Sequence, residues 1–203
     1  MIAITLPDGS VKQFKSETTP MGVARSISEG FARNVISASF NGKTIETSTP
    51  LTKDGELVLY TWRDKKGKEA FWHSSAHILA QALEDLYPNI KLTIGPAIEN
   101  GFYYDIDLVD NTISEKDLIT IENKMLEIAR GKHTFFIRES SKADALGYYK
   151  EQGNQYKVEL IKNLEEGTIT FCDHDNFTDL CRGGHIPHTG LVKAIKLMSI
   201  AGA

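Results

Sequence analysis

Two histidines on one predicted helix are the first residues in this sequence that could do chemistry. His73 and His77 are four residues apart within the segment 71–77. On a helix this spacing places both imidazoles on one face, with Cβ atoms about 5–6 Å apart, so they can share a metal ion, a water molecule or a substrate oxygen. No glutamate follows His73, so the His-Glu-x-x-His pattern of metalloproteases is absent. Taken alone, the pair also fits two histidines packed or solvated on the flank of a helix.

A second pair lies near the end of the sequence. Cys181 and His185 are separated by a segment that contains Gly183 and Gly184. Paired glycines permit a tight loop with unusual φ angles, which would turn both side chains toward one point, although such a loop can also be purely structural. Together the two pairs supply three imidazoles and one thiol, a donor set that zinc accepts.

These four donors do not by themselves predict an obligate zinc ion. A four-ligand zinc site is normally closed and structural, whereas hydrolysis needs an open position for water. Either one donor moves away from the metal, or the four residues hold water directly. Cys172 and His174 are rival donors of lower rank, and His188, which follows Pro187, is expected at a loop surface.

The composition is that of an ordinary globular protein. The chain has 203 residues, of which 41% are hydrophobic and 25% charged, and this excludes disorder, collagen and coiled coil. No run of about 18 apolar residues predicts a membrane span, and the N-terminus lacks the pattern of a secretory leader. Two cysteines cannot form a disulfide framework. We therefore expect a reduced, cytoplasmic protein.

The charge is distributed unevenly along the chain. Residues 1–62 carry six basic and six acidic side chains, so the whole net charge of -4 lies in residues 63–203. A free-standing nucleic-acid-binding protein usually has a basic excess, because neutralising phosphates supplies most of its affinity. If the substrate is a nucleic acid, other parts of a larger protein must do much of the binding.

The first 62 residues predict a small domain of the β-grasp (ubiquitin-like) type. Strands are expected at residues 2–6, 11–14, 35–40, 43–46 and 56–60, and a helix at residues 20–27. Turn residues separate these strands, including an Asn41-Gly42 pair that suits a two-residue hairpin. This order of elements favours a sheet packed on one helix.

Residues 63–203 predict a second, α+β domain with a mixed or antiparallel sheet and packed helices, so that the whole chain is α+β. The charged run 63–68 is expected to be a linker, followed by a helix over residues 69–87 with an apolar stripe beside the histidine face. Further helices are expected at 118–128, 142–151 and 154–164, with Ser114 and Asp117 forming a capping box before the first of them. Strand-like segments cover residues 90–107, 168–172 and 191–200, and residues 173–190 are expected to be rich in loops.

Several motifs together resemble one family, the N-terminal part of bacterial-type threonyl-tRNA synthetase. Residues 4–10 and 54–57 resemble its TGS domain, and residues 73–77, 94–96, 100–105, 156–158, 181–185 and 196–198 resemble its editing domain. The motifs cover the whole chain in the order of the family. One position departs from the pattern, since the family commonly has proline where Gly184 stands.

The resemblance implies a function in proofreading. Serine lacks one methyl group of threonine, and a binding pocket distinguishes one methyl group by only about 1–3 kcal/mol. A second site that hydrolyses Ser-tRNA(Thr) and spares Thr-tRNA(Thr) corrects the resulting errors. The resemblance also implies that the aminoacylation and anticodon-binding domains, with their ATP and zinc, are absent from this chain. The parent enzyme is expected to be a homodimer through those domains, and its partner is the acceptor end of tRNA(Thr).

The family's editing residues fall on seven positions of this sequence. His73 is expected to position or activate water, Lys157 to hold a second water or stabilise developing charge, and Asp179 to recognise the ammonium or hydroxyl group of the substrate. Tyr104 is expected to close the pocket, while the remaining three shape it: His77, Cys181 and His185. For this family the resemblance implies editing without a metal ion.

Three alternatives stay open from the residues alone. The chain could be a zinc hydrolase of the alanyl-tRNA editing type that acts in trans, with the metal held by His73, His77, Cys181 and His185. It could be a non-catalytic module that binds RNA or a regulatory partner. It could also be a structural fragment stabilised by zinc, in which case a chelator would lower its melting temperature.

Overall fold

The computed structural model describes residues 1–165, 167 and 169–202, and the α+β class is confirmed. Contacts divide the chain into two compact units: Met1–Trp72 with Gly183–Pro187, and His73–Arg182 with His188–Ala203. We call them unit 1 and unit 2. The expected domain boundary between residues 62 and 63 stays a prediction, because contacts alone do not show which segments fold independently.

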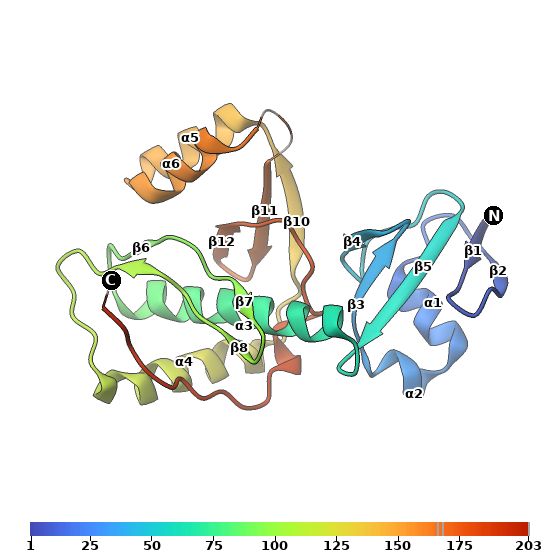
Figure 1. Ribbon diagram of the computed structural model, residues 1–203, viewed down its shortest axis with the longest axis horizontal. Helices are drawn as coiled ribbons and strands as arrows, with labels where there is room; N and C mark the ends of the chain where they lie inside the picture. Colours follow the sequence, from blue (N-terminus) through green and yellow to red (C-terminus); the bar gives the residue numbers. More distant parts are fainter. Residues whose placement is uncertain (166, 168, 203) are drawn as a thin grey trace. The chain divides into compact units, whose positions relative to one another are not determined.

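Unit 1 is built on a five-stranded sheet (Figure 1). Its strands are β1 (Ile2–Thr5), β2 (Val11–Phe14), β3 (Val35–Phe40), β4 (Lys43–Ile45) and β5 (Gly55–Thr61). They lie in the order β2-β1-β5-β3-β4, with β1 and β5 parallel and the other neighbours antiparallel. This is the expected β-grasp arrangement.

Two helices accompany this sheet. In α1 (Pro20–Ile27), the Thr19 side chain accepts a hydrogen bond from Gly22 N, and the proline occupies the first turn, where no backbone donor is needed. Val23 on this helix packs into the core with Ile4 and Leu57. The short helix α2 (Glu29–Ala32), which the pattern did not predict, is capped by Ser28, whose side chain accepts the Phe31 amide.

The expected linker over residues 63–68 is wrong for most of its length, because helix α3 spans Lys65–Leu86. Asp64 stabilises the start of this helix. Its carboxylate accepts hydrogen bonds from the backbone and side chain of Thr61, and its carbonyl accepts the Lys68 amide. A charged sequence can thus form a first helical turn once a preceding side chain closes the turn.

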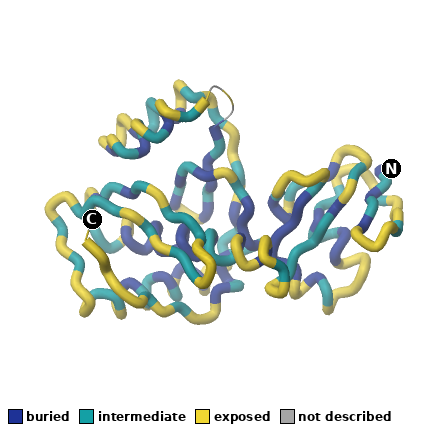
Figure 2. Tube along the Cα trace, viewed as in Figure 1, coloured by how far each residue is buried: buried dark blue, intermediate teal, exposed yellow. Residues whose placement is uncertain are grey.

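Residues 74–83 of α3 are buried on every face, as the dark segment along this helix in Figure 2 shows. The predicted single apolar stripe is therefore too narrow. Ala80 packs with Leu92 and Phe177, and Gln81 donates hydrogen bonds to Asp175 and Asn176. Because neighbouring segments surround the helix, its small and polar residues are buried as well, and His77 lies inside the core and not at its edge.

The strands of unit 2 differ from the expectation in length. The segment expected as one strand-like stretch over 90–107 forms two short antiparallel pairs: β6 (Lys91–Leu92) with β9 (Ile106–Asp107), and β7 (Ala97–Ile98) with β8 (Gly101–Phe102). The main sheet is antiparallel, with β11 (Ile169–His174) between β10 (Phe136–Ser140) and β12 (Phe177–Leu180). The pattern did not predict β10 or β12. The strand expected at 168–172 is confirmed from Ile169, and Thr168 lies outside the described residues.

The helices of unit 2 follow the predicted pattern. They are α4 (Leu118–Gly131), α5 (Lys142–Glu151) and α6 (Gln155–Asn163), and the last two lie side by side in Figure 1. The capping box of Ser114 and Asp117 is confirmed; it precedes a single 3-10 turn, η1 (Glu115–Asp117), that leads into α4. Among the described residues, none of the helices combines the length and apolar character that crossing a bilayer requires.

The strand expected at 191–200 is wrong. A 3-10 turn, η2 (Thr189–Leu191), is followed by residues 192–202 without strand pairing. The Leu197 amide donates to the Glu122 carboxylate on α4, which also forms an ion pair with Lys196. These bonds to a side chain take the place of a sheet ladder, so the alternating pattern of this segment does not produce a strand.

Candidate functional site

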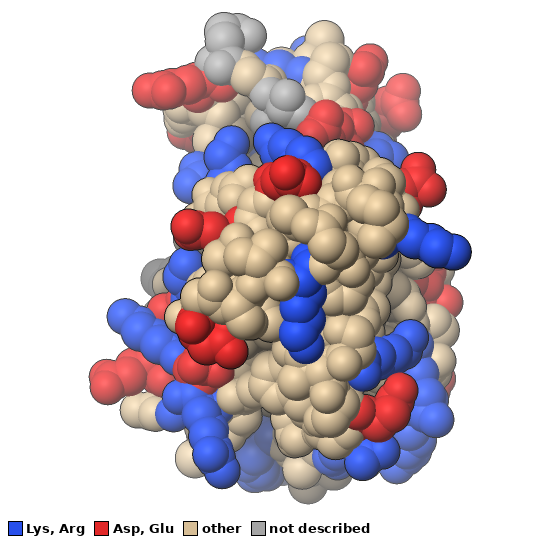
Figure 3. Space-filling view, turned by 90° about the vertical axis from the view of Figure 1, so that its right-hand side faces the viewer, with Lys and Arg blue, Asp and Glu red and all other residues tan. Residues whose placement is uncertain are grey.

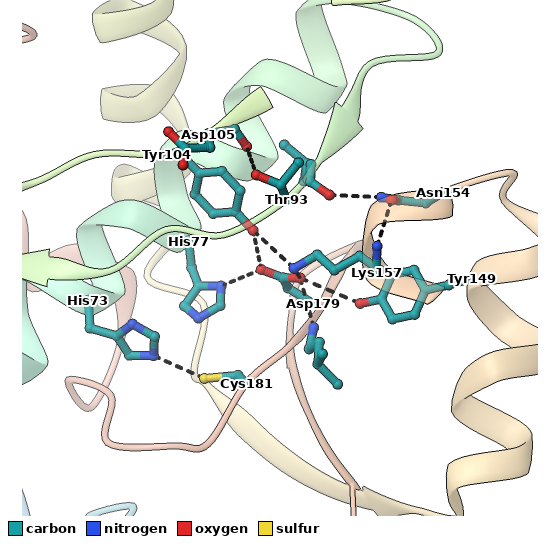
Figure 4. Close-up of polar contacts among 12 residues, drawn as sticks. His73, His77, Thr93, Tyr104, Asp105, Tyr149, Asn154, Lys157, Asp179 and Cys181 are labelled. Carbon is teal, nitrogen blue, oxygen red and sulfur yellow. Dashed lines mark hydrogen bonds and ion pairs between the residues drawn. The ribbon is translucent and has the colours of Figure 1, made fainter. Parts of the chain in front are cut away.

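The predicted histidine pair meets Cys181 inside unit 2. His73 Nε2 lies 3.0 Å from Cys181 Sγ, and the rings of His73 and His77 stand nearly perpendicular with centroids 4.7 Å apart (Figure 4). The helical spacing therefore places both imidazoles together, as expected. Cys181 is fixed by backbone pairing, because its amide donates to Thr170 O and its carbonyl accepts the Thr170 hydroxyl.

This group has the donors of a metal site. One ligand atom from each of His73, His77 and Cys181 lies within 4.8 Å of the others. Bond lengths of about 2.0–2.1 Å to nitrogen and 2.3 Å to sulfur would let one zinc ion reach all three, with a fourth position for a further ligand. The three residues thus fit zinc, although the same groups can hold water. The fourth predicted donor, His185, belongs to unit 1.

The rival donors Cys172 and His174 are held by other contacts, and the His174 ring centroid lies 6.5 Å from that of His77. Both are buried on β11, where Cys172 is the register partner of Asp179 and the His174 ring packs against Phe135 and Phe177. Neither belongs to the possible metal-binding group found among the described residues. Their lower rank stays a prediction.

Asp179 is the centre of a buried polar network. Its Oδ1 accepts hydrogen bonds from Lys157 Nζ at 2.5 Å and from the Leu180 amide at 2.7 Å. Its Oδ2 accepts the Tyr104 hydroxyl at 2.5 Å and lies 3.5 Å from His77 Nδ1. Figure 4 shows these side chains converging on the carboxylate. Since both oxygens already have donors, a substrate ammonium group could bind here only by sharing Asp179 or displacing one of them.

Lys157 is not a solvated helix lysine. It is only 2% exposed, and its ammonium group lies within reach of both Asp179 and, at 3.4 Å, the Tyr104 hydroxyl. Asn154 holds the beginning of α6 in place: its side-chain oxygen accepts the Lys157 amide, while its side-chain nitrogen donates to Leu92 O. A buried cation with one carboxylate partner and a phenol donor nearby can stabilise negative charge that develops beside it.

The phenol of Tyr104 remains a hydrogen-bond donor over the ordinary pH range. Burial, followed by the negative charge of Asp179 and the hydrogen bond to it, raises the pKa of Tyr104 well above its usual value. Burial and the same charge also raise the pKa of Tyr149, whose hydroxyl lies 3.5 Å from Asp179 Oδ1. Gly95 allows this placement, because a Cβ atom at that position would overlap the Tyr104 ring.

His185 has its own environment in unit 1. It is fully buried, and its Nδ1 lies 3.0 Å from Glu46 Oε1. His188 is half-buried and not at the surface as expected; its pKa is lowered by burial and by the positive charges of Lys193 and Lys132.

Three residues of these environments were not found from the sequence: Tyr149, Asn154 and Glu46. Asn154 stands immediately before a predicted helix, and this capping signal could have identified it. The other two owe their roles to contacts between distant segments, and no local pattern distinguishes them. Gly95 lies in the motif 94–96, but its close approach to Tyr104 was not predicted. Figure 3 shows basic and acidic side chains intermixed over one face of the molecule.

Comparison with known proteins identifies two domains in the chain. Residues 2–61 match the model of the TGS domain, and residues 169–202 match that of the threonyl and alanyl tRNA synthetase second additional domain. Threonine--tRNA ligase from Flavobacterium johnsoniae is 68% identical to this chain over 203 residues. In sequence, the chain is similar to the N-terminal region of the threonine--tRNA ligases.

Other threonine--tRNA ligases show the same relationship. That of Flavobacterium psychrophilum is 66% identical and that of Parabacteroides distasonis 50% identical, each over the whole of this chain. The chain spans about a third of the length of these relatives, since it covers 31% of each. The resemblance inferred from the motifs is thereby confirmed.

Proposed function

We propose that this chain hydrolyses the ester of mischarged Ser-tRNA(Thr) and spares Thr-tRNA(Thr), as a proofreading part of a threonine--tRNA ligase. One structural observation supports this most directly. The His73–His77–Cys181 group and the Lys157–Asp179–Tyr104 network form one continuous cluster, joined by the contact between His77 and Asp179. Proton-handling groups and groups that stabilise charge thus lie together in a chain related to threonine--tRNA ligases.

The proposed reaction needs few groups. Water attacks the carbonyl carbon of the aminoacyl ester while a base accepts a proton from that water, and a donor stabilises the oxyanion. The ester bond then breaks, and the proton passes from the base to the leaving ribose oxygen. His73 positions or activates the water, since an imidazole exchanges protons near neutral pH. Lys157 and Tyr104 are the donors for the developing negative charge. Asp179 orients both of them and recognises the substrate's ammonium or hydroxyl group.

The remaining predicted residues have a shaping role in this proposal. His77 and Cys181 form the side of the pocket next to His73, and His185 contributes from the loop 183–187. The additional methyl group of threonine would collide with the bound water or with the wall. Such a collision supplies discrimination that a synthetic site built for threonine cannot supply.

The proposed hydrolysis requires no metal ion. When bound, a zinc ion held by His73, His77 and Cys181, with His185 as the predicted fourth donor, would supply a polarised water molecule. Without it, the same side chains hold water directly. ATP and a further zinc ion belong, in this proposal, to the synthetic part of the larger protein.

The proposed partner is the acceptor end of tRNA(Thr) carrying serine. With a net charge of -4, this chain lacks the basic excess that would bind a tRNA on its own, so other domains of the parent enzyme supply most of the affinity. We propose that the parent is a homodimer through those domains and acts in the cytoplasm, where tRNA is charged.

The test is deacylation of Ser-tRNA(Thr) and Thr-tRNA(Thr) by the wild-type chain, by His73→Ala and by a control, His133→Ala, with and without chelator. His133 lies outside the cluster, where it contacts Asp175. We expect loss of serine alone, abolished by His73→Ala, retained in the control and indifferent to chelator. Intact Ser-tRNA(Thr), with both this chain and the full-length parent at high concentration, would refute the proposal.

A zinc-dependent editing activity of the alanyl type is the second candidate. The matched domain model covers both the threonyl and the alanyl enzymes, and His73, His77 and Cys181 fit a metal ion. In that case chelator would abolish deacylation and added zinc would restore it. A non-catalytic RNA-binding module would instead bind tRNA equally well with and without His73.

A further inference from the structure

Glu46 is a buried carboxylate outside the proposed reaction groups. It follows β4 directly and is 8% exposed. Its backbone is held by a turn, because its carbonyl accepts the Thr49 amide at 3.0 Å. The next residue, Thr47, is also anchored, since its carbonyl accepts the Met21 amide. The carboxylate therefore projects from a fixed point of unit 1.

The carboxylate of Glu46 binds the loop 183–187 through three donors. Oε1 accepts the Gly184 amide at 3.0 Å and lies 3.0 Å from His185 Nδ1, while Oε2 accepts the His185 amide at 3.2 Å. All these groups are buried. Hydrogen bonds to a buried charged acceptor are stronger than those between neutral groups, so this contact fixes both the loop backbone and the imidazole ring.

Gly184 has a backbone that suits this contact. Its φ is +93°, in the region that favours glycine, and a Cβ atom there would lie 3.1 Å from Thr44 Cγ2. A proline at this position, which the family pattern commonly has, could neither adopt this φ nor donate an amide hydrogen. Glycine at this position therefore supplies Glu46 with a donor that proline would lack.

We propose that Glu46 is a positioning residue for His185, which it holds in the tautomer that carries hydrogen on Nδ1 and a lone pair on Nε2. The opposite tautomer would place the Nδ1 lone pair against the carboxylate oxygen, which is repulsive. Carboxylate partners fix histidine tautomers in the same way around metal and proton-transfer sites. Its effect on deacylation rests on the proposed function, in which His185 takes part.

The tautomer is tested directly by long-range ¹H–¹⁵N NMR of the full chain at neutral pH, with the His185 signals assigned from a His185→Gln variant. We expect a protonated Nδ1 and an unprotonated Nε2 in the wild type, and loss of this single pattern in Glu46→Gln. Hydrogen on Nε2 in the wild type, or an unchanged pattern in Glu46→Gln, would overturn the proposal.

Deacylation of Ser-tRNA(Thr) is the second readout. We expect Glu46→Gln to lower the rate about 10–100-fold, the usual effect of removing a carboxylate that orients a histidine. Asp54→Asn is the matched control: Asp54 also accepts a backbone amide in unit 1, from Ala3, and should leave the rate and the His185 signals unchanged. Equal melting temperatures of the two variants show that folding is not the cause.

The two readouts separate this proposal from the proposed function. If the wild-type chain and the full-length parent leave Ser-tRNA(Thr) intact, the proposed function fails, and the NMR pattern still decides whether Glu46 sets the tautomer. If Ser-tRNA(Thr) is hydrolysed equally fast by wild type and Glu46→Gln, the positioning role is refuted while proofreading stands.

Discussion

Lys157 Nζ lies 2.5 Å from Asp179 Oδ1, and the two side chains are among the most buried charged groups of unit 2. A buried ion pair is weak support for stability as a whole, because desolvation offsets much of the attraction. Removing only one member is different, since the other charge is then left in the interior without compensation. The pair therefore makes stability and the proposed chemistry depend on the same two residues.

We expect Lys157→Met to destabilise the chain by about 3–5 kcal/mol, the usual cost of breaking a buried pair. The double variant Lys157→Met/Asp179→Asn should cost less than the sum of the single changes, because neither charge is left alone. Urea denaturation followed by circular dichroism measures this. Lys162→Met, an exposed lysine on the same helix, should be near neutral. Additive single and double changes would contradict the coupling.

Removing the Tyr104 hydroxyl should reduce deacylation without unfolding the chain. Tyr104→Phe loses the hydrogen bond to Asp179 and the contact with Lys157, while the ring still packs beside Gly95. Tyr103→Phe, which alters an exposed neighbour, should have no effect on the rate.

The ionisation of the Tyr104 phenol gives a separate test. Because burial and Asp179 raise the pKa of Tyr104 well above 10, the phenol should stay protonated until the chain unfolds in alkali. Ultraviolet titration of wild type and Tyr104→Phe should therefore coincide up to about pH 10, the reference value for tyrosine. A missing phenolate signal in the variant below that pH would show that Tyr104 ionises in the folded chain.

A methyl group added at Gly95 should disturb the site through Tyr104. Gly95→Ala places a Cβ atom where the Tyr104 ring lies, so the ring must shift, which disturbs its hydrogen bond to Asp179. We expect a marked loss of deacylation, with a melting temperature that falls less than for Lys157→Met. Gly147→Ala is the control: a Cβ atom there meets nothing within 4 Å in helix α5, and replacing a helical glycine gains about 0.5–1 kcal/mol.

The capping box before α4 predicts a dependence of stability on pH. Hydrogen bonds from the backbone and hydroxyl of Ser114 lower the pKa of Asp117 below 3.8. Because the folded value is lower than the unfolded one, this contribution is present above pH 3.8 and is lost as the pH falls through the folded value. Ser114→Ala should therefore lower the melting temperature at pH 7 but much less at pH 2. A difference in melting temperature that is the same at all pH values would contradict this dependence on Asp117.

How far the sequence predicts this protein depends on the range of the interaction. Helical spacing placed His73 and His77 on one face, and Ser114 with Asp117 marked a helix start, because both signals lie within four residues. The strand expected at 191–200 does not form, for the opposite reason. Its alternating pattern is local, but the conformation of the segment depends on a hydrogen bond to the distant Glu122.

The candidate site shows the same limit more strongly. The types and spacing of Cys181 and His185 made them candidates for chemistry, and the structure places Cys181 in contact with His73. Neither its residue type nor its spacing identifies Glu46 as a functional residue. It lies 139 residues before His185, and among 27 acidic residues only the folded loop distinguishes it. Partners that orient a reactive group are thus harder to predict than the group itself.

The alternation of buried and half-buried side chains along β12 limits where the length of this chain can change. Asp179 lies in β12 and Cys181 directly follows the strand; both are buried, while Leu180 between them is only half-buried. One edge of the sheet thus supplies a carboxylate to Lys157 and a thiol to His73. A single inserted residue between them would turn one of the two away. Natural or engineered changes of length should therefore spare residues 177–181 and accumulate instead in turns such as Glu99–Asn100, between β7 and β8.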